Sequence, residues 1–105
     1  MPSPRRAVFL DHQSLDLGDL DLSPLRNLFD ELELFPSTRP EQVAERLQGA
    51  VAVISNKVML DAATLAANPQ LRLILVAATG TNNVDLAAAR AQGITAVSYT
   101  HLRAH

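Results

Sequence analysis

The sequence has no cysteine and no tryptophan, and its aromatic residues are three phenylalanines and one tyrosine. Without cysteine the chain forms no disulfide bond and offers no thiolate to a metal or a substrate. This composition fits a reducing compartment, and we expect a cytoplasmic protein. With so few aromatic side chains, the core has to be built from Ala, Val, Leu and Ile.

Long apolar runs are also missing. No stretch approaches the roughly 18 apolar residues that suggest a membrane-spanning helix. The apolar run Ala7–Leu10 follows a basic pair, but it ends at Asp11 and is too short for a secretion signal. The net charge of −2 arises from charges of both signs and gives no electrostatic reason to bind nucleic acid or an anionic membrane. We therefore expect neither nucleic acid nor a membrane as a partner.

Glycine is scarce as well, with four residues at positions 18, 49, 80 and 93. No two of them have the spacing of the G-x-G-x-x-G dinucleotide fingerprint or of a Walker loop. The hydrolase motif G-x-S-x-G is absent too. The sequence therefore predicts that this chain binds no nucleotide cofactor.

Apolar, strand-like runs alternate regularly with helical segments along the chain, and the connections between them are short. Strands are predicted at Arg6–Leu10, Glu31–Phe35, Ala50–Ile54, Leu71–Ala78 and Ile94–Val97. Helices are predicted at Ser23–Asp30, between Thr38 and Gly49, at Asp61–Ala67 and at Val84–Gln92. Because right-handed crossovers place helices on the faces of a parallel sheet, the sequence predicts one α/β domain with about five parallel strands in three layers.

Polar residues mark the predicted helix starts. Thr38, followed three residues later by Glu41, has the spacing of a capping box, and Pro40 falls in the first turn, where its missing N–H costs little. Asp61 is the predicted N-cap of the next helix. Residues 15–22 alternate Leu with Asp or Gly and are predicted to form a loop.

Polar residues that follow three of the strands should meet at the carboxyl edge of the sheet. These residues are Asp11-His12, Ser55-Asn56-Lys57 and positions 79–83. The small residues Ala77, Ala78 and Gly80 leave backbone N–H groups unscreened, and the helix that follows adds the positive end of its dipole. This edge suits a carboxylate or a phosphate, with Lys57 as a countercharge.

Plainer interpretations of the same residues stay open. Gly80 can be an ordinary turn residue and Lys57 a solvated loop residue. His12 can act as a general base or have a structural role. His101 and His105 have the spacing of metal ligands on a helix, but no helical pattern surrounds them and no further ligand is near, so no metal site is predicted.

Residues 51–57, 71–85 and 88–94 together resemble a known family. The pattern Gly-x-Asn-Asn-Val-Asp at positions 80–85, directly after an apolar strand, is the most specific part of the match. These segments resemble the N-terminal part of the substrate domain of D-isomer-specific 2-hydroxyacid dehydrogenases, of the hydroxypyruvate reductase or glycerate dehydrogenase type. The resemblance implies a flavodoxin-like domain whose backbone amides at Ala78, Thr79 and Gly80 bind the substrate carboxylate. Asn56 and Lys57 would line the same cleft.

The resemblance also implies an activity and a cofactor for the intact enzyme. Members of the family are NAD- or NADP-dependent oxidoreductases that act on the CH–OH group of small D-2-hydroxy acids, and the intact enzyme is expected to be a homodimer. Their cofactor-binding fingerprint and their catalytic Arg, Glu and His belong to a second domain. Nothing in this sequence matches those positions, so we assign no catalytic residue and expect this chain alone to bind no cofactor and to be inactive.

The family pattern ends near Thr95. We interpret residues 1–95 as a partial substrate-binding domain, truncated before the cofactor-binding domain, and residues 96–105 as a non-native tail. Ala96 and Val97 can still complete the fifth strand.

Two alternatives come from other functional classes. A stand-alone receiver-like regulatory domain is favoured by Asp11 and Thr79, but the third strand ends in Ser55-Asn56, where such a domain needs an acceptor aspartate. A partner-binding module is the other alternative, because a truncated domain exposes apolar surface and tends to associate.

Overall fold

The computed structural model describes residues 5–12, 27–76 and 84–98. In this part of the chain one parallel sheet is formed by β1 (Arg6–Phe9), β2 (Glu31–Leu34), β3 (Ala52–Ser55), β4 (Leu73–Val76) and β5 (Thr95–Ser98). Successive strands from β2 onward are connected by α2 (Pro40–Arg46), α3 (Ala62–Ala66) and α4 (Leu86–Ala91). The predicted α/β class with a parallel sheet is confirmed. None of the described helices is long and apolar enough to cross a membrane.

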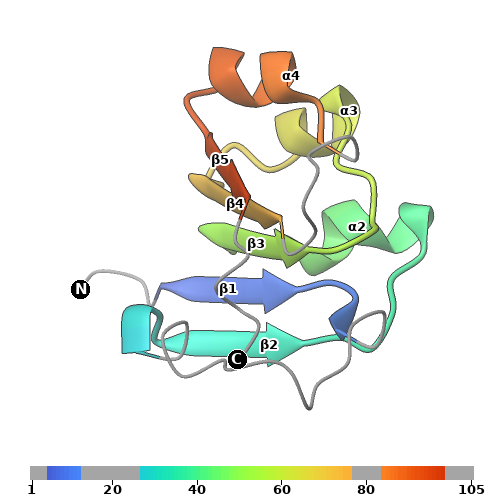
Figure 1. Cartoon of the computed structure of the whole chain (residues 1–105), viewed down its shortest axis with the longest axis vertical. Coiled ribbons are helices and arrows are strands. Elements are labelled where there is room, and N and C mark those ends of the chain that lie inside the picture. Colours follow the sequence, from blue (N-terminus) through green and yellow to red (C-terminus); the bar gives the residue numbers. More distant parts are fainter. Residues whose placement is uncertain (1–4, 13–26, 77–83, 99–105) are drawn as a thin grey trace.

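The strands lie in the order β2-β1-β3-β4-β5 (Figure 1). The chain begins in the interior at β1, moves outward to β2, and then crosses back over β1 to β3. From β3 onward each strand adds to the other side of the sheet. This is the flavodoxin-like order, with its topological switch point between β1 and β3. Ligands of open α/β sheets bind outside the carboxyl ends of the strands at such a point, so the topology directs attention to the loops after β1 and β3.

Strand side chains alternate between the two faces of the sheet. One face carries Val8, Leu10, Val53, Ile74 and Val76, all fully buried. The helices contribute Val43 and Leu47 from α2 and its C-cap, Leu65 from α3 and Ala89 from α4 to the same cluster. The three named helices therefore cover this face, and their packing stabilises the sheet mainly through burial of aliphatic surface.

The opposite face carries a smaller apolar cluster. Its buried members are Ala7, Phe9, Ala52, Ile54 and Leu75. Phe29, just before β2, is among the partly buried side chains that pack against them. Of the predicted helix Ser23–Asp30, the structure describes residues 27–30, of which 27 and 28 are helical. The rest of that helix and the predicted loop at 15–22 lie outside the described residues.

The start of α3 confirms one predicted cap, and the start of α2 corrects another. The Asp61 carboxylate accepts a hydrogen bond from the Thr64 N–H at 2.9 Å, as predicted for an N-cap. The prediction of Thr38 as the N-cap of α2 is wrong. The cap is Arg39, whose backbone N–H donates to the Gln42 side chain at 3.0 Å while its carbonyl accepts the Gln42 N–H at 2.9 Å.

The chain leaves α2 through a glycine in the left-handed region. Gly49 has a φ of +77°, a conformation that a residue with a Cβ atom rarely adopts. It lies two residues beyond the C-cap Leu47. Gln70, which precedes β4, donates to the Leu47 carbonyl at 3.0 Å, and the same carbonyl accepts the Ala50 N–H at 2.9 Å.

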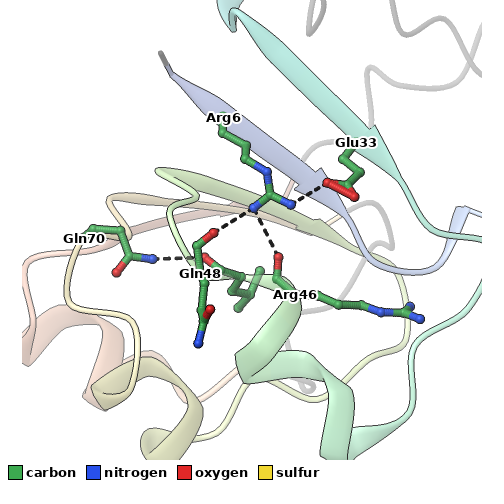
Figure 2. Close-up of polar contacts among 6 residues, drawn as sticks. Arg6, Glu33, Arg46, Gln48 and Gln70 are labelled. Atoms are coloured by element: carbon green, nitrogen blue, oxygen red, sulfur yellow. Dashed lines mark hydrogen bonds and ion pairs between the residues drawn. The ribbon is translucent and has the colours of Figure 1, made fainter. Parts of the chain in front are cut away.

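Arg6 joins three elements at the amino end of β1 (Figure 2). Its guanidinium donates to the carbonyl oxygens of Arg46 at 3.3 Å and Gln48 at 2.9 Å, at the C-terminal end of α2. It also forms an ion pair with Glu33 of β2. A cation is favourable at this end of a helix because the exposed carbonyls carry partial negative charge.

The fifth strand runs parallel to β4, with Thr95 opposite Leu73 and Ser98 opposite Val76. The expectation that Ala96 and Val97 complete this strand is confirmed. The non-native character of the tail stays a prediction, and residues 99–105 lie outside the described residues.

Candidate functional site at the carboxyl edge of the sheet

The loops after β1, β2 and β3 start at the same level of the sheet because backbone pairing continues past the strand ends. On one side of β1, the Leu10 N–H donates to the Ile54 carbonyl at 3.0 Å. On the other side, the Phe35 N–H donates to the Phe9 carbonyl at 2.9 Å, and the His12 N–H donates to the Phe35 carbonyl at 3.1 Å. Residues that follow β1 and β3 are therefore brought together, as the sequence predicted, whereas positions 79–83 lie outside the described residues.

Asp11 connects the first of these loops to the third. One carboxylate oxygen accepts the Asn56 N–H at 2.8 Å and the other accepts the Lys57 N–H at 2.6 Å. The Asp11 side chain is 4% exposed, so its charge is stabilised largely by these N–H donors rather than by bulk water. Its position at the switch point makes it the link between the two halves of the sheet.

The loop after β3 is held at several further points. The Ser55 hydroxyl donates to the Val58 carbonyl at 2.9 Å, which closes the turn. Beyond the turn, Leu60 forms a parallel bridge with Val84, and its carbonyl accepts the Asp85 N–H at 3.0 Å. Val84 therefore lies beside the end of the loop that carries Asn56 and Lys57.

A cavity of about 500 Å³ opens between the loops after β1, β2 and β3. Its lining consists of Asp11, Pro36, Ser37, Thr38, Pro40, Lys57, Val58 and Met59. Pro36, Pro40, Val58 and Met59 give it an apolar wall, while Lys57 is an exposed cation at its border. An anion with a short apolar or hydroxylated body matches this combination.

Thr38 and Arg46 hold in place the loop after β2, which forms one side of the cavity. The Thr38 hydroxyl donates to the Leu10 carbonyl at 2.6 Å and accepts from the Arg46 guanidinium at 2.7 Å. Arg46 also donates to the Ser37 carbonyl at 2.6 Å, and its guanidinium lies over the Phe35 ring, 4.2 Å from the centroid. Thr38 was predicted to cap α2, and its hydroxyl instead holds the loop after β2 against β1.

Two of the predicted site residues, Asn56 and Lys57, lie together in the loop after β3. The side chain of Asn56 is buried, whereas that of Lys57 is exposed. The other three predicted residues, Ala78, Thr79 and Gly80, lie outside the described residues, and their role stays a prediction. Val76, the last described residue before them, pairs with Ser55.

From the sequence, Asp11 was expected only as one of the polar residues at the carboxyl edge of the sheet. The signal for its role was a single aspartate directly after a buried strand, and nothing in the sequence tells which backbone groups it binds. Both carboxylate oxygens are engaged by N–H donors, an arrangement unlike the metal-binding acids of a receiver domain. Within the described residues no group of three His, Cys, Asp or Glu side chains could hold a metal ion.

His12 packs beside this site. Its ring meets the Phe9 ring edge to face, with 6.3 Å between the centroids. Its Nδ1 atom is buried and has no hydrogen-bond partner among the described residues. These contacts describe a packed side chain, and the general-base interpretation of His12 gains no support from them.

Comparison with known proteins identifies the family. The family model for the catalytic domain of D-isomer specific 2-hydroxyacid dehydrogenases matches residues 8–103. The chain belongs to this family. Glycerate dehydrogenase of Methylorubrum extorquens is 48% identical over 95 residues, which are 90% of this chain and 29% of that protein. The chain therefore spans less than a third of this curated relative.

Solved structures of 2-hydroxyacid dehydrogenase type share the fold. A glyoxylate reductase from Paecilomyes thermophila superposes with a TM-score of 0.73 at 21% identity, covering 93% of this chain and 32% of that one. The NAD⁺-bound 3-phosphoglycerate dehydrogenase of Entamoeba histolytica gives a TM-score of 0.70 at 18% identity, covering 91% of this chain and 33% of that one. At these identities the likeness establishes the domain architecture alone.

The described residues of this family member do not fit a dinucleotide. Its described glycines, Gly49 and Gly93, follow helices rather than strands, so neither is at the carboxyl edge where a pyrophosphate loop would lie. The loop after β1 instead carries the buried carboxylate Asp11, whose negative charge opposes a phosphate. A nicotinamide cofactor has no binding loop in this part of the molecule.

Proposed function

We propose that this chain is the substrate-binding part of an NAD- or NADP-dependent oxidoreductase that acts on the CH–OH group of small D-2-hydroxy acids of the glycerate and hydroxypyruvate type. The observation that carries the proposal is the 48% identity with a glycerate dehydrogenase over 90% of this chain. The cavity at the flavodoxin-like switch point, bordered by Lys57, supports it from the structure.

In this proposal the substrate carboxylate binds at the carboxyl edge between the loop after β3 and the segment after β4. The Lys57 ammonium supplies the countercharge, and the Asn56 side chain lines the cleft. Backbone N–H groups at Ala78, Thr79 and Gly80 donate to the carboxylate oxygens. Charge-assisted hydrogen bonds of this kind are about twice as strong as neutral ones, which suits a site that has to select small anions.

Oxidation of a 2-hydroxy acid removes a hydride from C2 and a proton from the hydroxyl group. We assign neither step to residues of this chain. The described residues offer no dinucleotide site, and no residue of the sequence matches the family's catalytic Arg, Glu or His. We therefore expect cofactor binding and both transfer steps to depend on another part of the intact enzyme. We predict that the 105-residue chain alone is inactive. A cytoplasmic location and a homodimeric intact enzyme stay predictions.

Titration of the ¹⁵N-labelled chain with D-glycerate tests the binding role. We expect amide resonances of residues 56–57 and 78–80 to shift with a common dissociation constant. Replacing Lys57 with Ala should weaken binding about tenfold, because one charge-assisted contact is lost. The control Arg72→Gln removes an exposed cation before β4, on the opposite edge of the sheet, and should bind like the wild type.

The result that overturns the binding role is an absence of localised shifts at millimolar D-glycerate. A nicotinamide-linked assay with hydroxypyruvate tests the second part of the proposal. Turnover above background by the purified chain would contradict the expectation that it is inactive alone.

A further inference from the structure

Asp11 has a place in the site that its family membership and its sequence do not assign. It is the second residue after β1, it is 4% exposed, and each of its carboxylate oxygens accepts a backbone N–H from the loop after β3. The two donors belong to Asn56 and Lys57, the residues that we place against the substrate. A buried charge so arranged fixes the direction of both N–H groups and hence the backbone between them.

The geometry points to Asp11 as the positioning residue of the substrate loop. It sets the backbone conformation of Asn56 and Lys57, so that their side chains are held for ligand binding before the ligand arrives. The inference rests on the proposed function for its ligand, but the loop conformation that Asp11 sets exists with or without a ligand.

The surroundings of Asp11 explain why a carboxylate is needed. The loop after β3 leaves the sheet with two successive N–H groups, at 56 and 57, that turn toward β1 instead of entering a ladder. A carboxylate can accept both at once, whereas an amide side chain of the same shape offers one acceptor oxygen and one competing donor. Asp11→Asn therefore leaves one of the two N–H groups unpaired in a buried place.

Further contacts hold the loop after β3 away from Asp11, and they limit how far the loop can move when Asp11 is replaced. The Ser55 hydroxyl binds the Val58 carbonyl at 2.9 Å and Leu60 is bridged to Val84, so the loop ends are fixed independently of Asp11. Loss of the Asp11 contacts should release the short stretch 56–57 while the rest of the loop stays in place. A change confined to residues 56–57 would therefore distinguish a positioning role of Asp11 from a general loss of the fold.

Hydrogen exchange tests the positioning directly in the 105-residue chain. In Asp11→Asn the amides of Asn56 and Lys57 should exchange roughly tenfold faster than in the wild type, with little change elsewhere. Asp61→Asn is the matched control, because Asp61 also accepts a backbone N–H, at 2.9 Å, but at the N-cap of α3 and outside the stretch 56–57. Asp11→Ala repeats the test without a competing donor, and Asp11→Asn keeps the test available if the alanine variant does not fold.

Titration with D-glycerate tests the consequence for binding. If the wild type binds, the dissociation constant should rise about tenfold in Asp11→Asn and stay unchanged in Asp61→Asn. Equal affinity of Asp11→Asn and wild type overturns the inference. If the wild type does not bind, the proposed binding role fails, and the exchange rates still decide the positioning. Faster exchange confined to 56–57 then supports it, and unchanged exchange overturns it.

Discussion

The two ends of β1 use opposite charges for the same purpose. At the amino end, Arg6 donates to two carbonyl oxygens at the C-terminal end of α2, those of Arg46 and Gln48. At the carboxyl end, Asp11 accepts two N–H groups that follow β3. In both places a charged side chain satisfies backbone groups that no helix or strand can pair, and the sign of the charge is set by whether those groups are acceptors or donors.

The two ends differ in their surroundings. Arg6 has a carboxylate partner, Glu33, and its surroundings form a closed set of contacts among β1, β2 and α2 (Figure 2). Asp11 accepts two N–H groups, and it borders a cavity of about 500 Å³ beside the exposed cation Lys57. This difference accords with our proposal that the carboxyl edge binds a ligand, whereas the contacts at the amino edge hold β1, β2 and α2 together.

Breaking the amino-edge contacts should have the largest effect on stability. Arg6→Leu removes the ion pair with Glu33 and leaves two carbonyl oxygens without their donor, so the free energy of unfolding should fall by about 2–3 kcal/mol. Urea unfolding measures the change. Binding of D-glycerate by the folded variant should equal that of the wild type, and a weakened affinity would contradict the division of roles between the two edges.

The carboxyl edge also contains a purely structural contact, and Thr38 tests how much it contributes. Thr38→Val keeps the side-chain shape but loses the hydrogen bond to the Leu10 carbonyl and the one from Arg46, which should cost about 1–2 kcal/mol. Thr38→Ser keeps the hydroxyl and should retain most of the stability. Thermal unfolding of the two variants side by side checks this, and equal losses would show that the hydroxyl is unimportant.

Replacing Gly49, which follows the Arg6 contacts at Gln48, should lower the stability by a smaller amount and for a different reason. Gly49 has a φ of +77° and no atom within 4 Å of the place where a Cβ would lie. Gly49→Ala should therefore cost about 1 kcal/mol through backbone strain alone. Gly93, with a φ of +80° and equally open space, should give the same loss in urea unfolding. A much larger cost at either position would reveal a steric contact.

The smallest effect concerns Asp61, an exposed carboxylate with the same kind of partner as the buried Asp11. The backbone N–H and then the side chain of Thr64 hold the pKa of Asp61 below its ordinary value of 3.8. Because the folded-state pKa is the lower one, the stabilisation is fully present above pH 3.8 and is lost as the pH falls through the folded-state pKa. Asp61→Asn should thus lower the melting temperature slightly at neutral pH, with the difference from wild type vanishing in acid. A constant difference at all pH values would contradict this.

The sequence predicted the elements where local chemistry decides the outcome. Continuous apolar runs became β3 and β4, Asp61 became an N-cap, and a glycine ended α2 because few other residues tolerate its backbone conformation. Alternation of strands and helices was sufficient for the α/β class. The prediction of Thr38 as an N-cap was wrong, because its hydroxyl group donates to the Leu10 carbonyl, 28 residues earlier in the chain.

By itself, then, the sequence determined the order of strands and helices, the family and the loops that carry the candidate site, since these depend on residues close together in the chain. Only the tertiary structure decided which polar groups satisfy one another. Asp11 binds N–H groups 45 and 46 residues further along, and Arg6 reaches carbonyls 40 and 42 residues away. Such partners are set by strand order and helix packing, because a buried charge binds whatever backbone groups the fold leaves unpaired beside it.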